Sequence, residues 1–414
     1  MLATSSTTAA VASRAGLRAP RRSSRDAARA MATRPLPPVV RTAGRVPLKT
    51  AATSSSVPPS YAPAGSELEL LSGLSGVVPD SMLSELEGGG KPRAATVNAA
   101  FILGVLKSPY GQAEFKSAVA GALAYDKCLI EVKDLRIACQ LDKAIVNVGS
   151  ILAGTVEGRV STEVDPRLAD DTEAMVKRVH HLCEMYKENK TALSKILFTI
   201  PATWEGLQAV KTLEAEGIEC HAVHCYSFVQ AVAAAQAGAS VIQMNVGRIT
   251  DWYNKNPGFI RDPTGPREDA GFKSEVDPGV RLIGRVFDYV KAHHPKTQLM
   301  ATGIRQKEQA LQLAGVDYMV VSPSAIEALQ TSSTLSGFND GVHGDSSSKL
   351  MEPVLTAEGA AERAGPKRDL VTQADFVDEL GYMGFDLLKG SVKGAVANIS
   401  RCEPFFMTQV GGQE

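Results

Sequence analysis

The sequence predicts an α/β protein, a single (β/α)8 TIM barrel with an extra helical segment at its C-terminal end. Between residues 74 and 329, short apolar runs alternate with longer amphipathic runs, which is the pattern of βα units around a parallel sheet. Eight of the short runs have the length of strands, and eight strands close such a barrel. The 414 residues suffice for this barrel and for additional segments.

The eight expected strands are short, mostly apolar runs that end in polar or glycine-containing sequence. In a barrel of this kind, functional side chains lie at the carboxyl ends of the strands. The end of each run is therefore where candidate site residues are expected. The runs cover residues 75–80, 93–98, 158–163, 196–200, 220–227, 240–246, 298–303 and 318–322.

Several helices between these strands are well marked. Asp171, Thr172 and Glu173 open a long amphipathic run that continues to Glu188, with Asp171 as a suitable N-cap. Residues 228–237 and 306–314 form shorter helical patterns. A last helical stretch, residues 374–399, could pack across one face of the barrel.

Composition divides the chain into four parts. Residues 65–330 form the expected barrel. Residues 331–366 are rich in Ser, Gly and Pro, which indicates a surface insertion or loop. Residues 367–414 contain the C-terminal helical segment. Residues 1–60 differ from all of these.

Residues 1–60 have the composition of an organelle transit peptide. They contain ten Lys or Arg residues and one acidic residue, Asp26, in a background of Ala, Ser and Thr. No apolar run is long enough for a secretory signal. We therefore expect import into a chloroplast, in preference to a mitochondrion. A disordered basic tail without a targeting role is the alternative.

The charge of the remaining chain argues against several classes of partner. The whole chain carries 44 basic and 45 acidic residues, so residues 61–414 have a net charge of −10. An acidic body does not favour nucleic acid or an anionic membrane as a partner. No apolar run approaches the length of a membrane span. GxGxxG and P-loop motifs are absent, so no nucleotide cofactor is expected.

Cysteine and histidine do not predict a metal site or a disulfide framework. The six cysteines contain no CxxC pair, and buried free thiols are the expected state. The segment Cys220 to Cys225 includes His221 and His224. On a regular strand these two histidines would face opposite sides and could not share an ion.

Five polar residues fall at expected strand ends. Taken singly, each could be a helix cap or a loop residue. Together on one rim they favour an anionic or polyhydroxylated ligand, because guanidinium groups bind phosphate with two hydrogen bonds. The five are Asp80, Asn98, Glu163, Arg248 and Arg305.

Four motifs, in order along the chain, resemble the transaldolase family. GRVSTEVDPRLADDTEAMV begins at Gly158, VGRITDWY at Val246, DPGV at Asp277 and LAGVD at Leu313. The first is long and rarely imitated. The resemblance implies a class I aldolase-like barrel without a cofactor. In such a barrel a lysine forms a Schiff base with a ketose phosphate, and dihydroxyacetone passes to an aldose phosphate.

The resemblance also implies roles for individual residues. Asp80 corresponds to the carboxylate that handles proton transfer at the carbon–carbon bond, and Glu163 to the one that polarises the catalytic water. Asn98 corresponds to the asparagine of a T-T-N-P turn, which here reads Thr96-Val97-Asn98-Ala99. Arg248 and Arg305 correspond to the arginines that hold the substrate phosphate. Sugar phosphates are thus the implied partners, and the oligomeric state, including a homodimer, stays open.

The largest departure from the family lies in ILFTIPATWEGLQ, residues 196–208. This segment resembles the one that carries the Schiff-base lysine, but Thr199 occupies the lysine position. A hydroxyl cannot condense with a ketone to form an iminium ion. No other lysine lies at a predicted strand end near this position.

Further departures lie on the fifth and sixth strands. His221 and Val223 stand where the family commonly has asparagine and threonine, and Gln243 and Asn245 lie where serine and phenylalanine are usual. These changes suggest a rebuilt or relaxed pocket. We therefore predict a transaldolase-family protein of the pentose phosphate pathway with impaired or altered turnover. The alternatives are a non-catalytic sugar-phosphate binder, or an isomerase or lyase that needs no imine.

Overall fold

The computed structural model describes residues 65–80, 92–108, 113–259, 277–331 and 353–407. The expected transit peptide, residues 1–60, lies outside these ranges, as do residues 332–352 of the expected insertion. The described elements start at helix α1, Glu67–Leu74, and end with helix α13, Gln373–Met407.

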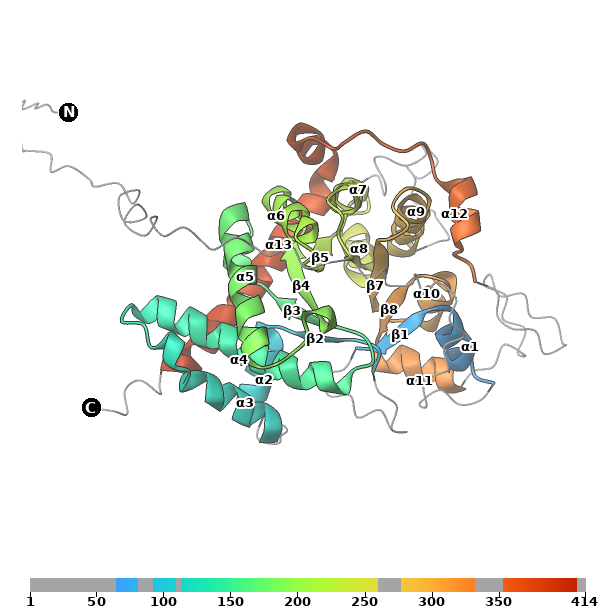
Figure 1. Cartoon of the computed structure of the whole chain (residues 1–414). Helices are drawn as coiled ribbons and strands as arrows, with labels where there is room; N and C mark the ends of the chain where they lie inside the picture. The colour runs from blue at the N-terminus through green and yellow to red at the C-terminus, as the bar shows by residue number, and fades with distance from the viewer. Residues whose placement is uncertain (1–64, 81–91, 109–112, 260–276, 332–352, 408–414) are drawn as a thin grey trace, which may run out of the picture. The chain divides into compact units, whose positions relative to one another are not determined.

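Eight parallel strands form one curled sheet, and all eight expected strands are confirmed (Figure 1). Their order is β1-β8-β7-β6-β5-β4-β3-β2, so sequential strands are neighbours from β2 to β8. In the described residues, β1 and β2 are not hydrogen-bonded to each other. The strands are β1 Gly76–Pro79, β2 Ala95–Val97, β3 Val160–Glu163, β4 Ile196–Pro201, β5 Cys220–Cys225, β6 Val241–Asn245, β7 Gln298–Ile304 and β8 Tyr318–Val321.

Helices cover the outer face of this sheet, as expected for a TIM barrel (Figure 1). All six residues of β4 are buried, because the strand is enclosed on both faces. The α-helices between β1 and β8 are α2 Ala99–Lys107, α3 Ala113–Leu123, α4 Lys133–Thr155, α5 Thr172–Glu188, α6 Trp204–Ala215, α7 Phe228–Gln236, α8 Val246–Lys255, α9 Pro278–His293 and α10 Lys307–Gln312. After β8 follow α11 Pro323–Thr331, α12 Ala357–Arg363 and α13.

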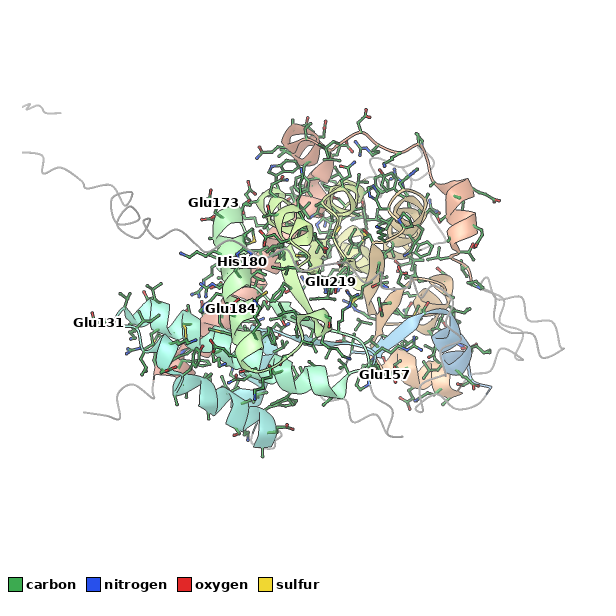
Figure 2. All side chains as sticks on the ribbon, viewed as in Figure 1. Glu131, Glu157, Glu173, His180, Glu184 and Glu219 are labelled. Atoms are coloured by element: carbon green, nitrogen blue, oxygen red, sulfur yellow. A yellow bond between two sulfur atoms is a disulfide. The ribbon has the colours of Figure 1, made fainter. Side chains whose placement is uncertain are left out.

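The three helices expected within the barrel are confirmed. Helix α5 begins where Asp171 accepts a hydrogen bond from the Ala174 N–H group. Helix α7 begins with a capping box between Ser227 and Gln230. None of the helices in the described part of the chain is both long and apolar enough to cross a membrane. The acidic side chains of Glu173 and Glu184 project from the outer side of α5 (Figure 2).

One part of the expected Ser/Gly/Pro-rich loop is a helix. Helix α12 packs its buried Ala360 inward, and Arg363 holds Asp288 of α9 through two hydrogen bonds of 2.9 and 2.7 Å. Thr356 caps the helix by accepting from the Gly359 N–H group. The expected insertion or loop over residues 331–366 thus contains a short alanine-rich helix at residues 357–363, which this ion pair stabilises.

Helix α13 runs past the carboxyl ends of several strands, as expected for the C-terminal segment. Cys402 donates its S–H group to the carbonyl of Ala99, which follows β2. Arg167, shortly after β3, pairs with Glu403 at 2.9 Å. Ser391 contacts Tyr226 at the end of β5. Gly381 interrupts the helix with a φ of 67°, a conformation that glycine adopts at little cost.

The prediction of six free cysteines was wrong for two of them. Cys128 and Cys139 form a disulfide across the start of α4, with their Cα atoms 5.5 Å apart. The two cysteines are 11 positions apart in the sequence, so no short spacing motif reveals the pair. The turn before α4 folds back onto the first turns of that helix and brings the thiols together. The remaining thiols are buried and free: Cys183, Cys220, Cys225 and Cys402.

Candidate functional site

The orientation of β3 and β4 defines which side chains enter the barrel. The Thr162 hydroxyl lies 2.6 Å from the Tyr186 hydroxyl of α5, so Thr162 points outward. Phe198 of β4 also contacts the Tyr186 ring. Because strand side chains alternate, Glu163 and Thr199 point into the interior.

The register of the sheet aligns three candidate residues. Thr199 pairs with Glu163 of β3 on one side and with His221 of β5 on the other. Residues in register on neighbouring strands point to the same face. The position expected for the Schiff-base lysine therefore lies between a carboxylate and an imidazole, at the interior face of the barrel.

An apolar floor closes the interior below these residues. It is a small cluster, separate from the main core, that consists of Leu197, Val241 and Met300 with Tyr318 and Val320. TIM barrels fill their interior with layers of side chains from alternate strands. Here the layers above the floor become polar, which is the composition of a ligand site.

The alternation of the strands places the remaining candidates above the floor. Two steps along a strand return a side chain to the same face. Every candidate on the strands therefore faces the interior or its carboxyl rim. In the pairing register, Glu163 lies level with Thr199 and His221, Thr96 with Ser161, Val223 with Pro201 and Gln243 with Met300. Asp80, Asn98 and Asn245 lie at or directly after the ends of β1, β2 and β6.

The hydroxyl group of Thr199 is hydrogen-bonded to the backbone of the neighbouring strand. Its side chain is 7% exposed, and its hydroxyl donates to the Thr162 carbonyl at 3.3 Å. Thr199 is thus satisfied by the backbone of β3 without a ligand. A hydroxyl in this position provides neither the amine nor the positive charge that imine chemistry needs.

Glu163 is the carboxyl group that lies in register with Thr199. Its Oε2 atom accepts a 2.7 Å hydrogen bond from the Ala99 N–H group at the start of α2. Burial, with a contribution from the nearby Asp165 carboxylate, raises the pKa of Glu163 to about 7 despite that hydrogen bond. A carboxyl group with a pKa near neutrality can donate or accept a proton at physiological pH.

His221 is a buried neutral imidazole with one unpaired nitrogen. Its Nδ1 atom lies 2.9 Å from the Ser161 hydroxyl, whereas Nε2 has no hydrogen-bond partner among the described residues. Burial, with the charges of Arg159 and His224, lowers the pKa of His221 to about 3. The ring is therefore uncharged and leaves one nitrogen available for a hydrogen bond.

The depressed pKa of His221 predicts a loss of stability in acid. The unfolded chain gains a proton near pH 6.5, whereas folded His221 does so only near pH 3. The contribution of neutral His221 to the free energy of unfolding is thus present above pH 6.5 and is lost progressively as the pH falls toward 3. Between pH 8 and pH 5, the free energy of unfolding of the wild type should fall by about 2 kcal/mol relative to His221→Asn.

Urea titrations at several pH values measure this difference. Thr302→Val is the control, because Thr302 is buried on β7 and does not titrate. Its stability curve should run parallel to that of the wild type. A parallel curve for His221→Asn as well would contradict the prediction.

Two asparagines of the expected site act as helix caps. Asn98 accepts from the Phe101 N–H group at 2.8 Å and begins α2. Asn245 accepts from the Arg248 N–H group at 2.9 Å and begins α8. Both side-chain oxygens are therefore engaged with the backbone, which positions the strand-to-helix turns of the rim.

Other candidates have unengaged side chains. Asp80 and Thr96 are exposed, and Gln243 is half-buried. Within the described residues, none of these three side chains forms a hydrogen bond or an ion pair. They are polar groups that face the interior and remain free to contact a ligand.

Arg248 and Arg305 lie close together at the ends of β6 and β7. Arg305 donates two hydrogen bonds of 2.9 Å from Nη1 to Asp251, which follows Arg248 on α8. Arg248 donates from Nη1 to the Ser391 hydroxyl at 2.6 Å and to the Tyr226 hydroxyl at 3.4 Å. Both arginines are exposed, as an anion site at the mouth of the barrel requires.

Two glycines permit the side chain of Arg305 to lie close to the first turn of α8. A Cβ atom on Gly247 would lie 2.9 Å from the Cζ and Nε atoms of Arg305 and 2.8 Å from the Gly303 carbonyl. Gly303 itself has a φ of 66°, and its Cβ would lie 2.4 Å from Oδ1 of Asn245. The guanidinium group of Arg305 therefore lies directly against the backbone at the first turn of α8.

The end of β5 is not the regular strand that the sequence analysis assumed. His224 has a φ of 60°, and the pairing with β6 shifts between Ala222 and Cys225. This bulge breaks the alternation from which the orientation of His224 relative to His221 was inferred, so that step was wrong. Burial and the charge of Arg248 lower the pKa of His224 to about 4. No group of metal-binding side chains occurs among the described residues.

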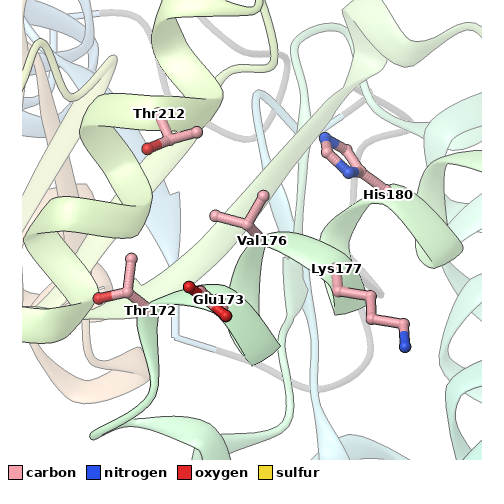
Figure 3. Close-up of a pocket in the computed structure, with 6 residues that line it drawn as sticks. All are labelled: Thr172, Glu173, Val176, Lys177, His180 and Thr212. Atoms are coloured by element: carbon pink, nitrogen blue, oxygen red, sulfur yellow. The ribbon is translucent and has the colours of Figure 1, made fainter. Parts of the chain in front are cut away.

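A surface pocket lies away from the strand ends. It opens between α5 and α6 (Figure 3), and its His180 is paired with Glu216 at 2.6 Å. It includes none of the predicted site residues and is not part of the barrel interior. Its lining residues are Thr172, Glu173, Val176, Lys177, His180 and Thr212.

Comparison with known proteins agrees with this barrel. A sequence model of the family Transaldolase/Fructose-6-phosphate aldolase matches residues 90–369. The chain belongs to this family. Transaldolase A of Escherichia coli K12 is 36% identical over 239 residues, which make up 58% of this chain and 71% of that protein. A transaldolase of Shewanella amazonensis is 35% identical over 267 residues, or 64% of this chain and 80% of that protein.

The match with the transaldolase family has defined limits along the chain. It includes β2 to β8 and the positions of Glu163, Thr199, Arg248 and Arg305, but β1 with Asp80 precedes it. Helix α13 begins at Gln373, after the end of the match. Contacts between α13 and the site are therefore features that the family model does not describe.

Three residues of the site were missed from sequence. Asp251 lies within the VGRITDWY motif, three residues after Arg248, so helical spacing could have indicated it. Tyr226 and Ser391 gave no signal, because their meeting depends on how α13 crosses the barrel.

Proposed function

We propose that this transaldolase-family protein binds a phosphorylated sugar at the carboxyl end of its barrel and lacks the lysine-dependent transfer of dihydroxyacetone. The observation that carries the proposal is the pair Arg248 and Arg305 beside the first turn of α8, above a polar interior. The resemblance to the family supports Thr199 as the residue at the lysine position. A helix N-terminus and two guanidinium groups favour a phosphate.

The polar interior supports a polyhydroxylated chain attached to that phosphate. Unengaged Gln243, the free nitrogen of His221 and the carboxyl group of Glu163 can donate to or accept from hydroxyl groups. An apolar ligand would leave these groups unpaired, which costs about 1–3 kcal/mol for each buried group. The relatives named transaldolase support a ligand from the sugar phosphates of the pentose phosphate pathway.

A second candidate is an imine-independent isomerase or lyase that acts on a sugar phosphate. Glu163 favours it, because a carboxyl group with a pKa of about 7 suits proton transfer. Asp80 would be the partner carboxylate at the end of β1. Weak turnover that depends on pH and disappears in Asp80→Ala would support this candidate.

Binding of fructose 6-phosphate tests the main proposal. The melting temperature of residues 65–414 should rise with ligand, since a ligand that binds only the folded state stabilises it. Arg248→Ala and Arg305→Ala should each weaken binding about 10- to 100-fold, because each removes charge-assisted hydrogen bonds of about 1.5–3 kcal/mol. Titration calorimetry gives the affinities.

Arg401→Ala is the matched control, since Arg401 is an exposed arginine of α13 that, within the described part of the chain, forms only a 3.4 Å hydrogen bond to Asn398. Its affinity for fructose 6-phosphate should equal that of the wild type. If the wild type binds neither fructose 6-phosphate nor sedoheptulose 7-phosphate, the proposed function is wrong.

The location in a chloroplast remains part of this proposal. Its support is the basic, Ser- and Ala-rich composition of residues 1–60. Fusion of these residues to a fluorescent protein should direct it into isolated chloroplasts with cleavage of the fusion. Retention outside the organelle would contradict it.

A further inference from the structure

We propose that helix α13 completes the phosphate site, with Ser391 and Tyr226 acting as positioning residues for Arg248. This inference rests on the proposed function, because it concerns the same anion site. It adds a part of the chain, residues 373–407, that lies outside the match to the family.

Two buried hydroxyl groups contact the Nη1 atom of Arg248. Ser391 is 4% exposed and Tyr226 is 2% exposed, and their hydroxyl oxygens lie 2.7 Å apart. Nη1 of Arg248 donates to Ser391 at 2.6 Å and to Tyr226 at 3.4 Å. An otherwise exposed, flexible side chain is thus fixed by groups that cannot move freely, which lowers the entropy lost when an anion binds.

The bonds made by Nη1 leave the other edge of the guanidinium group free. Arg248 forms no further hydrogen bond within the described residues, so its Nε and Nη2 donors are unpaired. Arg305 shows the same arrangement, because only its Nη1 atom contacts Asp251. The Nε–Nη2 edge is the one that binds a phosphate with two parallel hydrogen bonds.

The two arginines differ in the charge of their anchors. Asp251 compensates the charge of Arg305 in an ion pair, whereas the hydroxyl anchors of Arg248 are neutral. Arg248 has no acidic partner within 4.0 Å in the described part of the chain. Its full positive charge is therefore available to the ligand, and Ser391 orients that charge without cancelling it.

The path of α13 keeps Ser391 in this position. Gly384 lies so close to α7 that a Cβ atom there would be 3.2 Å from Cβ of Ser227. Asp386 accepts a 2.9 Å hydrogen bond from the Trp252 indole of α8. These two contacts join α13 to the same turns that carry Tyr226 and Arg248, so the three residues are held as one unit.

Titration of purified protein with inorganic phosphate and with fructose 6-phosphate tests the inference. Ser391→Ala and Tyr226→Phe should each lower the affinity for both ligands about tenfold, as expected for the loss of one hydrogen bond to a charged group. The double variant should be little worse than either single variant, because the residues act on the same guanidinium group. Ser391→Thr, which keeps the hydroxyl group, should restore affinity.

A charge change at the same position gives a second measurement. Ser391→Asp places a carboxylate beside Arg248, which should pair with the arginine and weaken phosphate binding about 100-fold. Ser400→Ala is the matched control, since Ser400 is an exposed serine on the same helix. Its affinity should be unchanged.

The outcomes separate this inference from the proposed function. If the wild type binds phosphate and sugar phosphate, but Ser391→Ala, Tyr226→Phe and Ser391→Asp bind them equally well, α13 has no part in the site. A loss in Ser391→Ala that Ser391→Thr does not restore also overturns the positioning role. If the wild type binds neither ligand, both the proposed function and this inference fail.

Discussion

Replacing Thr199 by lysine should create the transfer activity that we propose the natural chain lacks. Thr199 lies in register between Glu163 and His221 and points into the barrel. A lysine there would be largely desolvated, which lowers its pKa and increases the fraction of free amine. Turnover should therefore rise from the background of the assay to a measurable rate in Thr199→Lys.

The activity is measured as the rate of dihydroxyacetone transfer from fructose 6-phosphate to erythrose 4-phosphate. Borohydride reduction in the presence of fructose 6-phosphate should attach the donor carbon chain to Thr199→Lys through a secondary amine, which mass spectrometry detects. Thr199→Met is the matched control, because methionine has similar length without an amine. It should show neither turnover nor labelling.

The comparison of the wild type with Thr199→Lys has three informative results. Activity in Thr199→Lys alone indicates that the lysine is the lost component and that the pocket is otherwise intact. Activity in the wild type would refute the proposed loss of transfer and require another nucleophile. A folded, ligand-binding Thr199→Lys without activity would assign the loss to further changes such as Val223 and Gln243.

The side chains in register with Thr199 carry little charge near neutral pH. His221 is held neutral by burial, and Glu163 carries only a partial negative charge near pH 7 because its pKa is about 7. A neutral polyhydroxylated chain suits the same surroundings well, because each group can exchange hydrogen bonds with hydroxyl groups.

Most of the barrel could be predicted from sequence because its signals are local. Strand β4, for example, is an apolar run interrupted only by Thr199 and is buried at every position, and the helix cap Thr203 follows it closely. Once such a strand is located, alternation alone indicates that Thr199 and Leu197 share a face. The alignment of Glu163, Thr199 and His221 follows from parallel pairing in register.

The features that sequence did not reveal depend on contacts between distant segments or on local irregularities. Ser391 reaches Arg248 across 143 residues of chain, and no pattern near Ser391 marks it as a site residue. The bulge at His224 depends on a left-handed backbone conformation that a histidine adopts only when its surroundings require it. The Cys128–Cys139 disulfide likewise depends on how the chain turns into α4.

Replacing Gly247 by alanine should weaken phosphate binding about 100-fold. The added Cβ atom would lie 2.9 Å from Nε and Cζ of Arg305, on the edge that is free to bind the anion, and 2.8 Å from the Gly303 carbonyl. Arg305 must therefore turn away and lose its two hydrogen bonds to the ligand, each about 1.5–3 kcal/mol. Crowding against the backbone should also lower stability by about 1–3 kcal/mol.

Calorimetric titration with fructose 6-phosphate, beside urea unfolding without ligand, separates the two effects of Gly247→Ala. Gly154→Ala on α4 is the matched control, because no atom lies within 4 Å of its added Cβ. Its affinity should be that of the wild type, and its stability should rise by about 1 kcal/mol from better helix propensity. Wild-type affinity in Gly247→Ala would show that Arg305 does not bind the phosphate from this position. If Gly247→Ala does not fold, Arg305→Gln tests the same bonds, because it removes the guanidinium group without crowding the glycine.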